Sequence, residues 1–282
     1  MRVVVAGAAG LLAAAIIREF SRSHDVVALD RQALDITDEA AVARVVAAAR
    51  PDVVINCAAY NDVDGAEDDA VTALTVNAFA VRALARATRA ASAAFVHYGT
   101  DFVFDGTATT PYAEDDPPNP RGVYAASKLL GEWFTLEMPS AYVLRVESLF
   151  GEGGGSRRGS VATIIARIRA GQPVPVFTDR TVSPTFTADA ARATAALLAR
   201  RAPPGLYHCV NSGATTWPAI AAEAARLLDL PLRTAAITLD SVALRAPRPK
   251  YCALSNAKLA AAGVAMPTWQ SALGEYLSTT NS

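Results

Sequence analysis

The stretch VVVAGAAGLLAAAII, residues 3–17, decides the fold class of this 282-residue chain. A β-branched run ends at a first glycine, and a helix-forming run begins after a second one. The first glycine lets the chain leave a strand at angles that a side chain would forbid, and the second lets a pyrophosphate approach the helix N-terminus. The spacing is G-x-x-G rather than G-x-G-x-x-G, so the motif depends on its setting between strand and helix. We therefore predict a dinucleotide site that includes Gly7, Gly10, Leu11 and Leu12.

Short β-branched runs alternate with longer helical patterns through the first half of the chain. The strand-like runs are RVVVAG, DVVALD, DVVINCAA, AAFVHYGT and AYVLRVES, and the helical stretches are 11–22, 38–49, 71–91 and 124–137. Such alternation is typical of a parallel sheet with helices on both faces. The runs are continuously apolar, as strands buried on both faces should be. The predicted fold class is α/β, a Rossmann-type doubly wound parallel sheet.

The second half of the chain is less regular. It opens with SLFGEGGGSRRGS, which we interpret as a mobile glycine-rich loop. Patterns for a helix at 160–171, a strand PVPVF, a helix at 188–201, a strand GLYHCV, a helix at 217–229 and a final helix near 268–277 follow. We expect 1–150 to be mainly an NAD(P)-binding domain. Residues 151–282 should be mainly a smaller substrate-binding lobe, with some segments returning to the first domain.

The composition excludes several classes of function. The net charge is −1 at pH 7, which leaves no field for capturing nucleic acid or an anionic membrane. The chain lacks the run of about eighteen uncharged apolar residues that a spanning helix needs, and its opening is too short of apolar residues for a signal peptide. Cys57, Cys209 and Cys252 have no metal-binding spacing, so we expect buried thiols and no metal site. A cytoplasmic protein without a nucleic-acid or membrane partner is predicted.

The second strand ends at residues that could select the cofactor. Asp30 could bind an adenosine ribose, and it disfavours a 2′-phosphate by like charge, whereas Arg31 could pair with one. The two side chains leave NADH and NADPH equally open. Asp35 and Ile36 stand where a segment could close over the adenine, although a loop that caps the next helix explains them as well.

A tyrosine and a lysine stand four residues apart in VYAASKLLGE, residues 123–132. Taken alone, this spacing describes an ordinary surface helix. Together with G-x-x-G, an Asn-x-Ala-Ala segment and a hydroxyl residue after the fourth strand, Y-x-x-x-K resembles the extended short-chain dehydrogenase/reductases. RPDVVINCAAYNDVDGAED, HYGTDFVFDGT, PYAEDDPPNPRGVYAASKLLGE, LRVESLFG, SPTFTADAARA and GLYHCVNSGATTW are, in that order, similar to the dTDP-4-dehydrorhamnose reductase family.

The resemblance implies roles for the residues that match the family's motifs at the reductive site. A ketone reduced by a nicotinamide hydride needs a proton donor within reach, which would be Tyr124. An ammonium one helical turn away, together with the positive ring of the oxidised cofactor, would stabilise the tyrosinate, so Lys128 would help to lower the pKa of Tyr124 and would hold the nicotinamide ribose. Thr100 would give a second hydrogen bond to the ketone oxygen. Ala58, Ala59, Tyr60 and Asn61 would line the cofactor, Thr100, Asp101 and Phe102 would contact the sugar, and Asn56 and Asn77 would hold backbone loops.

The sequence departs from the family pattern on the sugar side. Gly99 replaces a serine before the threonine, and Glu147 and Ser148 replace a serine and the tryptophan that packs against the sugar. We expect a roomier, more polar substrate pocket that includes Glu147 and Ser148. Near the C-terminus, Arg248 or Lys250 could meet a diphosphate.

These observations predict an NAD(P)H-dependent oxidoreductase. Its expected reaction is reduction of the 4-keto group of a nucleotide-linked 6-deoxy sugar, best matched by dTDP-4-dehydrorhamnose giving dTDP-L-rhamnose. Two alternatives stay open: a nucleotide-sugar epimerase with tightly bound NAD, and a non-catalytic NAD(P)-binding regulatory subunit. The expected partner is a nucleotide sugar, and the expected assembly is a monomer or homodimer.

Overall fold

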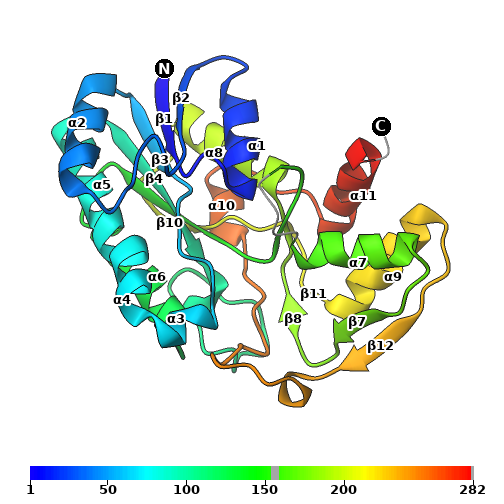
Figure 1. Cartoon of the computed structure of the whole chain (residues 1–282). Helices are drawn as coiled ribbons and strands as arrows, with labels where there is room; N and C mark the ends of the chain where they lie inside the picture. The colour runs from blue at the N-terminus through cyan, green and yellow to red at the C-terminus, as the bar shows by residue number, and fades with distance from the viewer. Residues whose placement is uncertain (154–158, 281–282) are drawn as a thin grey trace.

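A computed structural model describes residues 1–153 and 159–280. Part of the glycine-rich loop predicted from the sequence, residues 154–158, lies outside the described residues. Six parallel strands form the main sheet in the order β10-β5-β4-β3-β1-β2 (Figure 1). Their bounds are β1 Arg2–Ala6, β2 Asp25–Leu29, β3 Val53–Asn56, β4 Ala94–Thr100, β5 Ala141–Val146 and β10 Gly205–His208. The predicted α/β fold class is confirmed.

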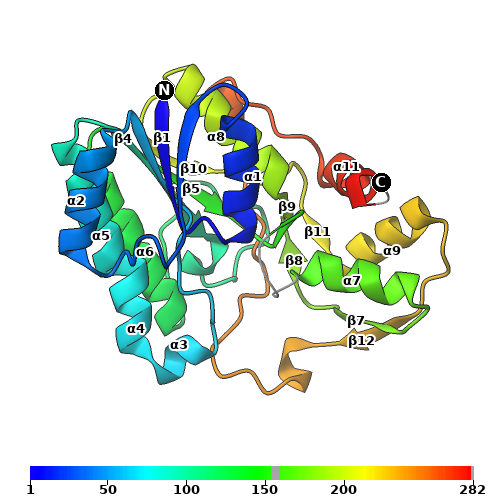
Figure 2. The same cartoon turned by 45° about the horizontal axis from the view of Figure 1, so that its top comes forward.

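Helices cover both faces of this sheet (Figure 2). One face carries α1 Leu11–Phe20 and α8 Thr187–Ala199, which contact each other. The other face carries α2 Glu39–Ala49, α5 Ala80–Ala90 and α6 Val123–Leu136. Strands β3 and β5 are buried along their whole length, which explains why their sequences read as continuous apolar runs. Since β2 and β3 flank β1 on opposite sides, the carboxyl ends of β1 and β3 mark the point where such sheets bind nucleotides.

The helical stretch at 71–91 is interrupted. It consists of α4 Ala70–Leu74, a π-helical turn Thr75–Phe79 and α5. Within the described residues, Ala70–Ala90 is long and apolar enough to cross a membrane by length and composition alone. It contacts α2 and α6, so we interpret it as a core helix of the fold.

A smaller lobe lies beside the sheet, on the right of Figure 1. Its helices are α7 Ser160–Arg169, α9 Trp217–Leu228 and α11 Trp269–Thr280. Its short strand pairs are β7 Val174–Phe177 with β12 Thr234–Ile237, β8 Thr181–Val182 with β11 Thr215–Thr216, and β6 Leu149–Phe150 with β9 Thr185–Phe186. The smaller lobe has its own apolar core, built from α7, α9, α11 and the strands beside them.

Two predicted elements of the second half belong to the first domain instead. The strand within GLYHCV is β10, and it pairs with β5 at the edge of the main sheet. The helix predicted at 188–201 is α8, which packs against α1. These are segments of the kind expected to return to the first domain, because Leu197 and Tyr207 complete the apolar core between the sheet and α1. The remaining short helices are α3 Gly65–Asp68 and α10 Ala257–Ala261.

Candidate active site

Gly7 and Gly10, which follow β1, are needed for different structural reasons. Gly7 has φ +78°, and a Cβ atom there would come within 2.5 Å of the Ala58 backbone nitrogen. Gly10 has an ordinary φ of −79° at the N-terminus of α1, and a Cβ there would meet only the Gly7 carbonyl oxygen, at 3.3 Å. Gly7 thus lets the first and third strand ends approach each other. Gly10 leaves the helix N-terminus open to an anion.

Two buried asparagines hold the loop after β3. Asn56 accepts a hydrogen bond from the Ala58 amide at 3.0 Å. Asn77 accepts from the Tyr60 amide at 2.8 Å and donates to the Tyr60 carbonyl and to the Ser127 hydroxyl. Asn77 lies in the π-helical turn, which aims its side chain at this loop. The predicted role of both asparagines in holding backbone loops is confirmed, and Ser127 ties this network to the helix that carries Tyr124.

A cavity of about 370 Å³ lies beside the glycine loop. Arg31, Asp35 and Ile36 line it, as does the whole predicted segment Ala58–Asn61. The Arg31 side chain is 90% exposed, with its Nε 3.9 Å from Asp35. The Asp35 carboxylate accepts hydrogen bonds from the Thr37 hydroxyl and amide, which lower its pKa.

Asp30 holds its own turn, and its contact with the adenosine ribose stays a prediction. Its Oδ1 accepts the backbone amides of Gln32 and Ala33 at 3.0 and 2.9 Å, so it holds the turn after β2. It is absent from the described residues that line the cavity, whereas Arg31 is among them. Of the two charged residues directly after the second strand, Arg31 is the one that lines this cavity.

A second cavity, of about 290 Å³, continues from the first. Both are lined by Gly10, Cys57, Ala58, Ala59 and Asn61. The second also includes Leu11, Leu12, Thr100, Tyr124 and Lys128. This continuous path, open at the helix N-terminus and ending at a phenol and an ammonium, fits an extended dinucleotide. The residues present therefore suit a nicotinamide cofactor whose reactive ring lies at the Tyr124 end.

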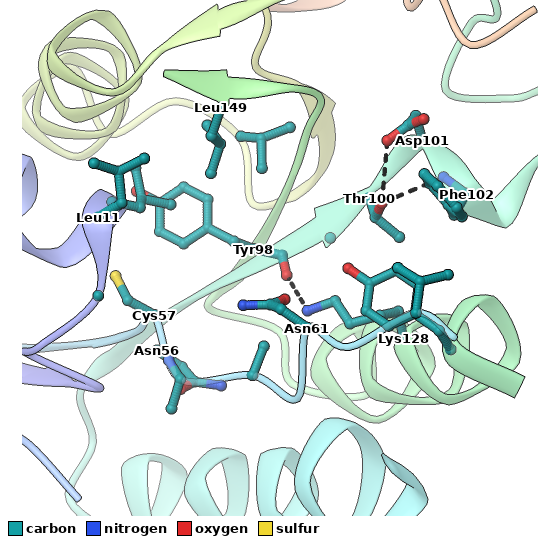
Figure 3. Close-up of a pocket in the computed structure, with 18 of the residues that line it drawn as sticks. Leu11, Asn56, Cys57, Asn61, Tyr98, Thr100, Asp101, Phe102, Lys128 and Leu149 are labelled. Carbon is teal, nitrogen blue, oxygen red and sulfur yellow. Dashed lines mark hydrogen bonds between the residues drawn. The ribbon is translucent and has the colours of Figure 1, made fainter. Parts of the chain in front are cut away.

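Figure 3 shows the polar groups at that end of the path. Thr100 ends β4, and its hydroxyl donates to Asp101 Oδ1 at 3.1 Å and accepts from the Phe102 amide at 3.3 Å. Lys128 is buried, and its Nζ donates to the Tyr98 carbonyl oxygen at 2.6 Å. Tyr124 is also buried, with its ring edge-on to Phe102 at 5.7 Å. The structure thus brings the three predicted catalytic residues to one cavity.

The titration of Tyr124 and Lys128 follows from burial. Burial and then the Asp101 carboxylate raise the pKa of Tyr124, while hydrogen bonding with the Thr100 side chain opposes this rise. Burial lowers the pKa of Lys128 to about 8, against the influence of Glu132 and Cys57. The rise at Tyr124 is opposite to the predicted lowering. The predicted direction needs the further positive charge that an oxidised nicotinamide ring would bring beside the phenol.

The packing around position 99 explains why this residue is glycine. A side chain at this position would collide with the Glu132 carboxylate. Glu132 forms a buried ion pair with Arg145, with 2.8 Å between Oε2 and Nη2. The missing hydroxyl before Thr100 therefore makes room for a buried ion pair between α6 and β5.

The predicted substrate residues divide into two groups. Asp101, Phe102 and Ser148 line the catalytic cavity together with Thr100. Glu147 is absent from the described lining and turns behind the cavity, where it accepts the Ser183 amide. Its predicted place in the pocket was wrong, because successive residues at a strand end point to opposite sides. Ser148 itself has φ +43°.

The predicted phosphate-binding cations already have partners. Arg248 donates to Asp64 Oδ2 and to the Ala246 carbonyl, both at 2.9 Å. Its guanidinium carbon also lies 5.9 Å from the centre of the Phe102 ring. Lys250 is exposed, with its Nζ 3.9 Å from Asp179 and from Asp240. The geometry does not favour Arg248 as a free anion site.

The sequence analysis missed Arg180 and the role of Cys252. Arg180 Nη2 donates to Cys252 Sγ at 3.0 Å, and its Nε donates to the Pro249 carbonyl. Asp101, Glu147 and Cys252 each place one potential metal-binding atom within 4.8 Å of the others. The guanidinium supplies positive charge to this group of acids. The one feature of the sequence that could have indicated this group is position. Asp101 comes directly after β4 and Glu147 directly after β5, and these strands are neighbours in the sheet.

A further cavity, of about 230 Å³, lies in the smaller lobe between α7 and β7. Arg180 lines it too, so this guanidinium stands between the smaller lobe's cavity and the acids behind the catalytic one. The other polar side chains that line it are Ser160, Thr163, Arg167 and Trp217. The Trp217 indole nitrogen is buried and has no hydrogen-bond partner among the described residues.

Known proteins resemble this chain over nearly its whole length. A family model described as RmlD substrate binding domain matches residues 1–282. A dTDP-4-dehydrorhamnose reductase of Streptomyces griseus is 41% identical, over 97% of this chain and 92% of the relative. A probable dTDP-4,6-dihydroxy-2-methyloxan-3-one 4-ketoreductase of Streptomyces antibioticus is 40% identical, over 98% of this chain and 94% of the relative.

A solved structure gives the same result. The dTDP-4-dehydrorhamnose reductase of Bacillus anthracis, in complex with NADP, aligns over 99% of both chains with a TM-score of 0.92 and 30% identity. The resemblance inferred from the motifs is confirmed. This chain belongs to the RmlD substrate binding domain family, which includes the dTDP-4-dehydrorhamnose reductases.

Proposed function

We propose that this oxidoreductase uses NADPH or NADH to reduce the 4-keto group of dTDP-4-dehydrorhamnose, giving dTDP-L-rhamnose. The observation that carries this proposal is the shared cavity. Thr100, Tyr124 and Lys128 line the same space as the open glycine loop. The names of the related reductases supply the substrate class.

The protein's own residues would manage the proton in this reaction. A bound nicotinamide supplies the hydride that reaches the ketone carbon. Tyr124 holds the proton that the developing alkoxide takes, and Thr100 stands beside it as a second hydrogen-bonding group. Lys128 holds a positive charge one helical turn from the phenol and can bind ribose hydroxyls. Val146 and Leu149 add apolar side chains to the lining of the same cavity.

We infer a preference for NADPH over NADH. Arg31 is the charged residue that follows the second strand and lines the cavity at the adenine end. Asp30 is engaged by two backbone amides of its own turn. A guanidinium with an exposed side chain can pair with a 2′-phosphate.

The thymidine diphosphate would extend into the smaller lobe. The cavity between α7 and β7 offers two guanidinium groups, Arg167 and Arg180, which suit phosphate oxygens. Its unpartnered indole N–H at Trp217 suits a carbonyl oxygen of the base. Arg180 lies on the side toward Asp101, so the diphosphate would pass it on the way to the sugar.

A different keto sugar is the second candidate substrate. Ser148 lines the catalytic cavity where the family pattern has a tryptophan, which leaves room for additional groups on the sugar. A relative 40% identical to this chain carries the name of a 4-ketoreductase for another dTDP-linked sugar. We expect dTDP-4-dehydrorhamnose to be accepted and bulkier 4-keto sugars to compete with it.

The experiment is an NAD(P)H oxidation assay with a panel of dTDP-linked 4-keto sugars, read together with cofactor retention. We expect the purified protein to exchange its cofactor and to oxidise one NADPH per sugar reduced. Retained NAD with interconversion of sugar epimers would favour the epimerase alternative. Cofactor binding without oxidation would favour a regulatory subunit. The expected location is the cytoplasm, and the assembly, monomer or homodimer, stays a prediction.

A further inference from the structure

Two buried carboxyl groups lie directly behind the catalytic threonine. Asp101 follows β4 and Glu147 follows β5, and these strands are neighbours whose register pairs Thr100 with Val146. The side chains come together because both strands end at the same edge of the sheet. Asp101 is 3% exposed and Glu147 is 2% exposed. Neither carboxyl can therefore rely on water to stabilise a charge.

Each carboxyl has one bonded and one unbonded oxygen. Asp101 Oδ1 accepts the Thr100 hydroxyl, and Glu147 Oε2 accepts the Ser183 amide. Asp101 Oδ2 and Glu147 Oε1 are buried and have no hydrogen-bond partner among residues 1–153 and 159–280. Buried polar atoms in native proteins are nearly always satisfied. These two atoms therefore call for a proton or a bound group, and one oxygen of each acid lies within 4.8 Å of an oxygen of the other.

The charge around the pair is unbalanced when both acids are ionised. Arg180 is the cation that acts on both Asp101 and Glu147. The other titratable groups that face them are Cys252, Tyr251 and Tyr124, and each has its pKa raised, first by burial, which keeps it neutral. One guanidinium against two carboxylates leaves one negative charge in a buried site. Taking up one proton removes this charge.

We propose that Asp101 and Glu147 together hold one proton in the resting protein, and that this proton returns to Tyr124 through the Thr100 hydroxyl after each hydride transfer. The resting part of this proposal rests on the geometry of the pair, and the relay rests also on the proposed function. Tyr124 gives its phenolic proton to the alkoxide formed at the sugar. The Thr100 hydroxyl, which donates to Asp101 Oδ1 at rest, then turns to the tyrosinate and gives up its proton as it takes one from Asp101, and the pair regains a proton from solvent.

The direction of titration agrees with this assignment. Burial, followed by the charge of Asp101, raises the pKa of Glu147 well above its ordinary value. Burial raises the pKa of Asp101 to about 6, against the influence of Arg180 and Thr100. Burial of both acids therefore favours one proton on the pair, and Glu147 returns a proton to Asp101 when Asp101 donates one. Glu147 acts through Asp101, so it is a positioning residue.

A proton suits this group better than a metal ion. Arg180 donates to Cys252 Sγ at 3.0 Å, so a guanidinium already occupies the sulfur. Cys252 itself donates to the Pro249 carbonyl, as a protonated thiol does. A cation bound beside this guanidinium would be repelled by it.

Glu147→Gln tests the resting proton directly. Glutamine keeps the size and the acceptor for Ser183 but carries no exchangeable acid proton, and Asp101 then faces Arg180 alone and ionises. Infrared spectroscopy at neutral pH in D₂O should show the carbonyl band of a protonated carboxyl in the wild type, lost in Glu147→Gln. The control is Glu137→Gln, which changes an exposed glutamate at the end of α6 and should keep the band. An unchanged band in Glu147→Gln, or a stoichiometric metal ion bound to the wild type, would overturn the proposal.

Rapid-mixing kinetics tests the relay. In Glu147→Gln, Tyr124 begins protonated, so the first NADPH oxidised per site should proceed at the wild-type rate. Later turnovers should slow by about tenfold, less than the 10²–10⁴-fold typical of losing the acid itself, because solvent remains a slower source. Imidazolium in the buffer should restore part of the steady-state rate.

Equal losses in the first and later turnovers, or a steady-state rate equal to that of the wild type, would overturn the relay. A wild-type protein that reduces no 4-keto sugar would refute the proposed function instead. The infrared result would still decide whether the pair holds a proton.

Discussion

The two walls of the catalytic cavity satisfy their polar groups in different ways. On the nucleotide wall, formed by Gly10 and the segment 57–61, uncharged amides do the positioning, and Asn77 bonds both backbone groups of Tyr60. On the carboxyl wall, Asp101 lines the cavity, Glu147 and Arg180 interact with it from outside the lining, and two carboxyl oxygens lack partners among the described residues. The first wall is held by hydrogen bonds between neutral groups. The second wall titrates, and it lies against the residues that move the proton.

The largest expected effect comes from the residue between the two walls. Tyr124→Phe removes the proton donor but no phosphate contact, so kcat should fall by about 10²–10⁴-fold. Cofactor affinity, measured by NADPH fluorescence titration, should stay close to that of the wild type. Near-normal turnover in the purified variant would show that the phenol is not the acid.

A second substitution breaks the nucleotide wall alone. In Gly10→Val, a branched side chain would stand over the open N-terminus of α1, where the pyrophosphate must approach. Loss of about two hydrogen bonds to a charged group predicts a roughly 100-fold weaker NADPH affinity. The measurement is a fluorescence titration, with circular dichroism to verify folding. Unaltered affinity in a folded variant would place the phosphates elsewhere.

A third substitution sharpens the account of cofactor choice. Arg31→Ala removes the cation from the adenine end, and the loss of one charge-assisted bond predicts about tenfold weaker binding of NADPH. NADH binding should change little, since it carries no 2′-phosphate. Paired titrations with the two cofactors provide the measurement. Equal changes for both would mean that Arg31 does not read the phosphate.

The smallest effect is expected on the sugar side of the cavity. Ser148→Trp restores the aromatic residue of the family pattern, and partial burial of a ring against the sugar should raise kcat/KM for dTDP-4-dehydrorhamnose by about threefold. Bulkier keto sugars should lose activity in the same variant. If the rate falls for every sugar, the cavity is already filled in another way and does not have the extra room inferred from Ser148.

The nucleotide wall could be predicted from the sequence because its signals are local. Gly7 and Gly10 lie between β1 and α1, and the stretch 58–61 lies just after β3. The four-residue spacing of Tyr124 and Lys128 also indicates a catalytic pair when it occurs together with the neighbouring motifs. These are contacts within short segments, where backbone geometry follows from residue type.

The carboxyl wall could not be predicted in this way. It joins Asp101, Glu147, Arg180 and Cys252, which come from distant parts of the chain, and only the register of β4 against β5 brings the first two together. The sequence did not show that Asp30 would hold its own turn, nor which segments of the second half would return to the first domain. Both outcomes depend on tertiary packing.

The central claim is that a hydride passes in this cavity from the bound nicotinamide cofactor to the sugar carbonyl. The most direct test supplies NADPH deuterated at the transferable position of the nicotinamide and analyses the product by NMR. The account predicts one deuterium per molecule of dTDP-L-rhamnose, bound to C4 of the sugar. Product formed without deuterium at C4, or sugar interconverted while the cofactor stays unchanged, would contradict it.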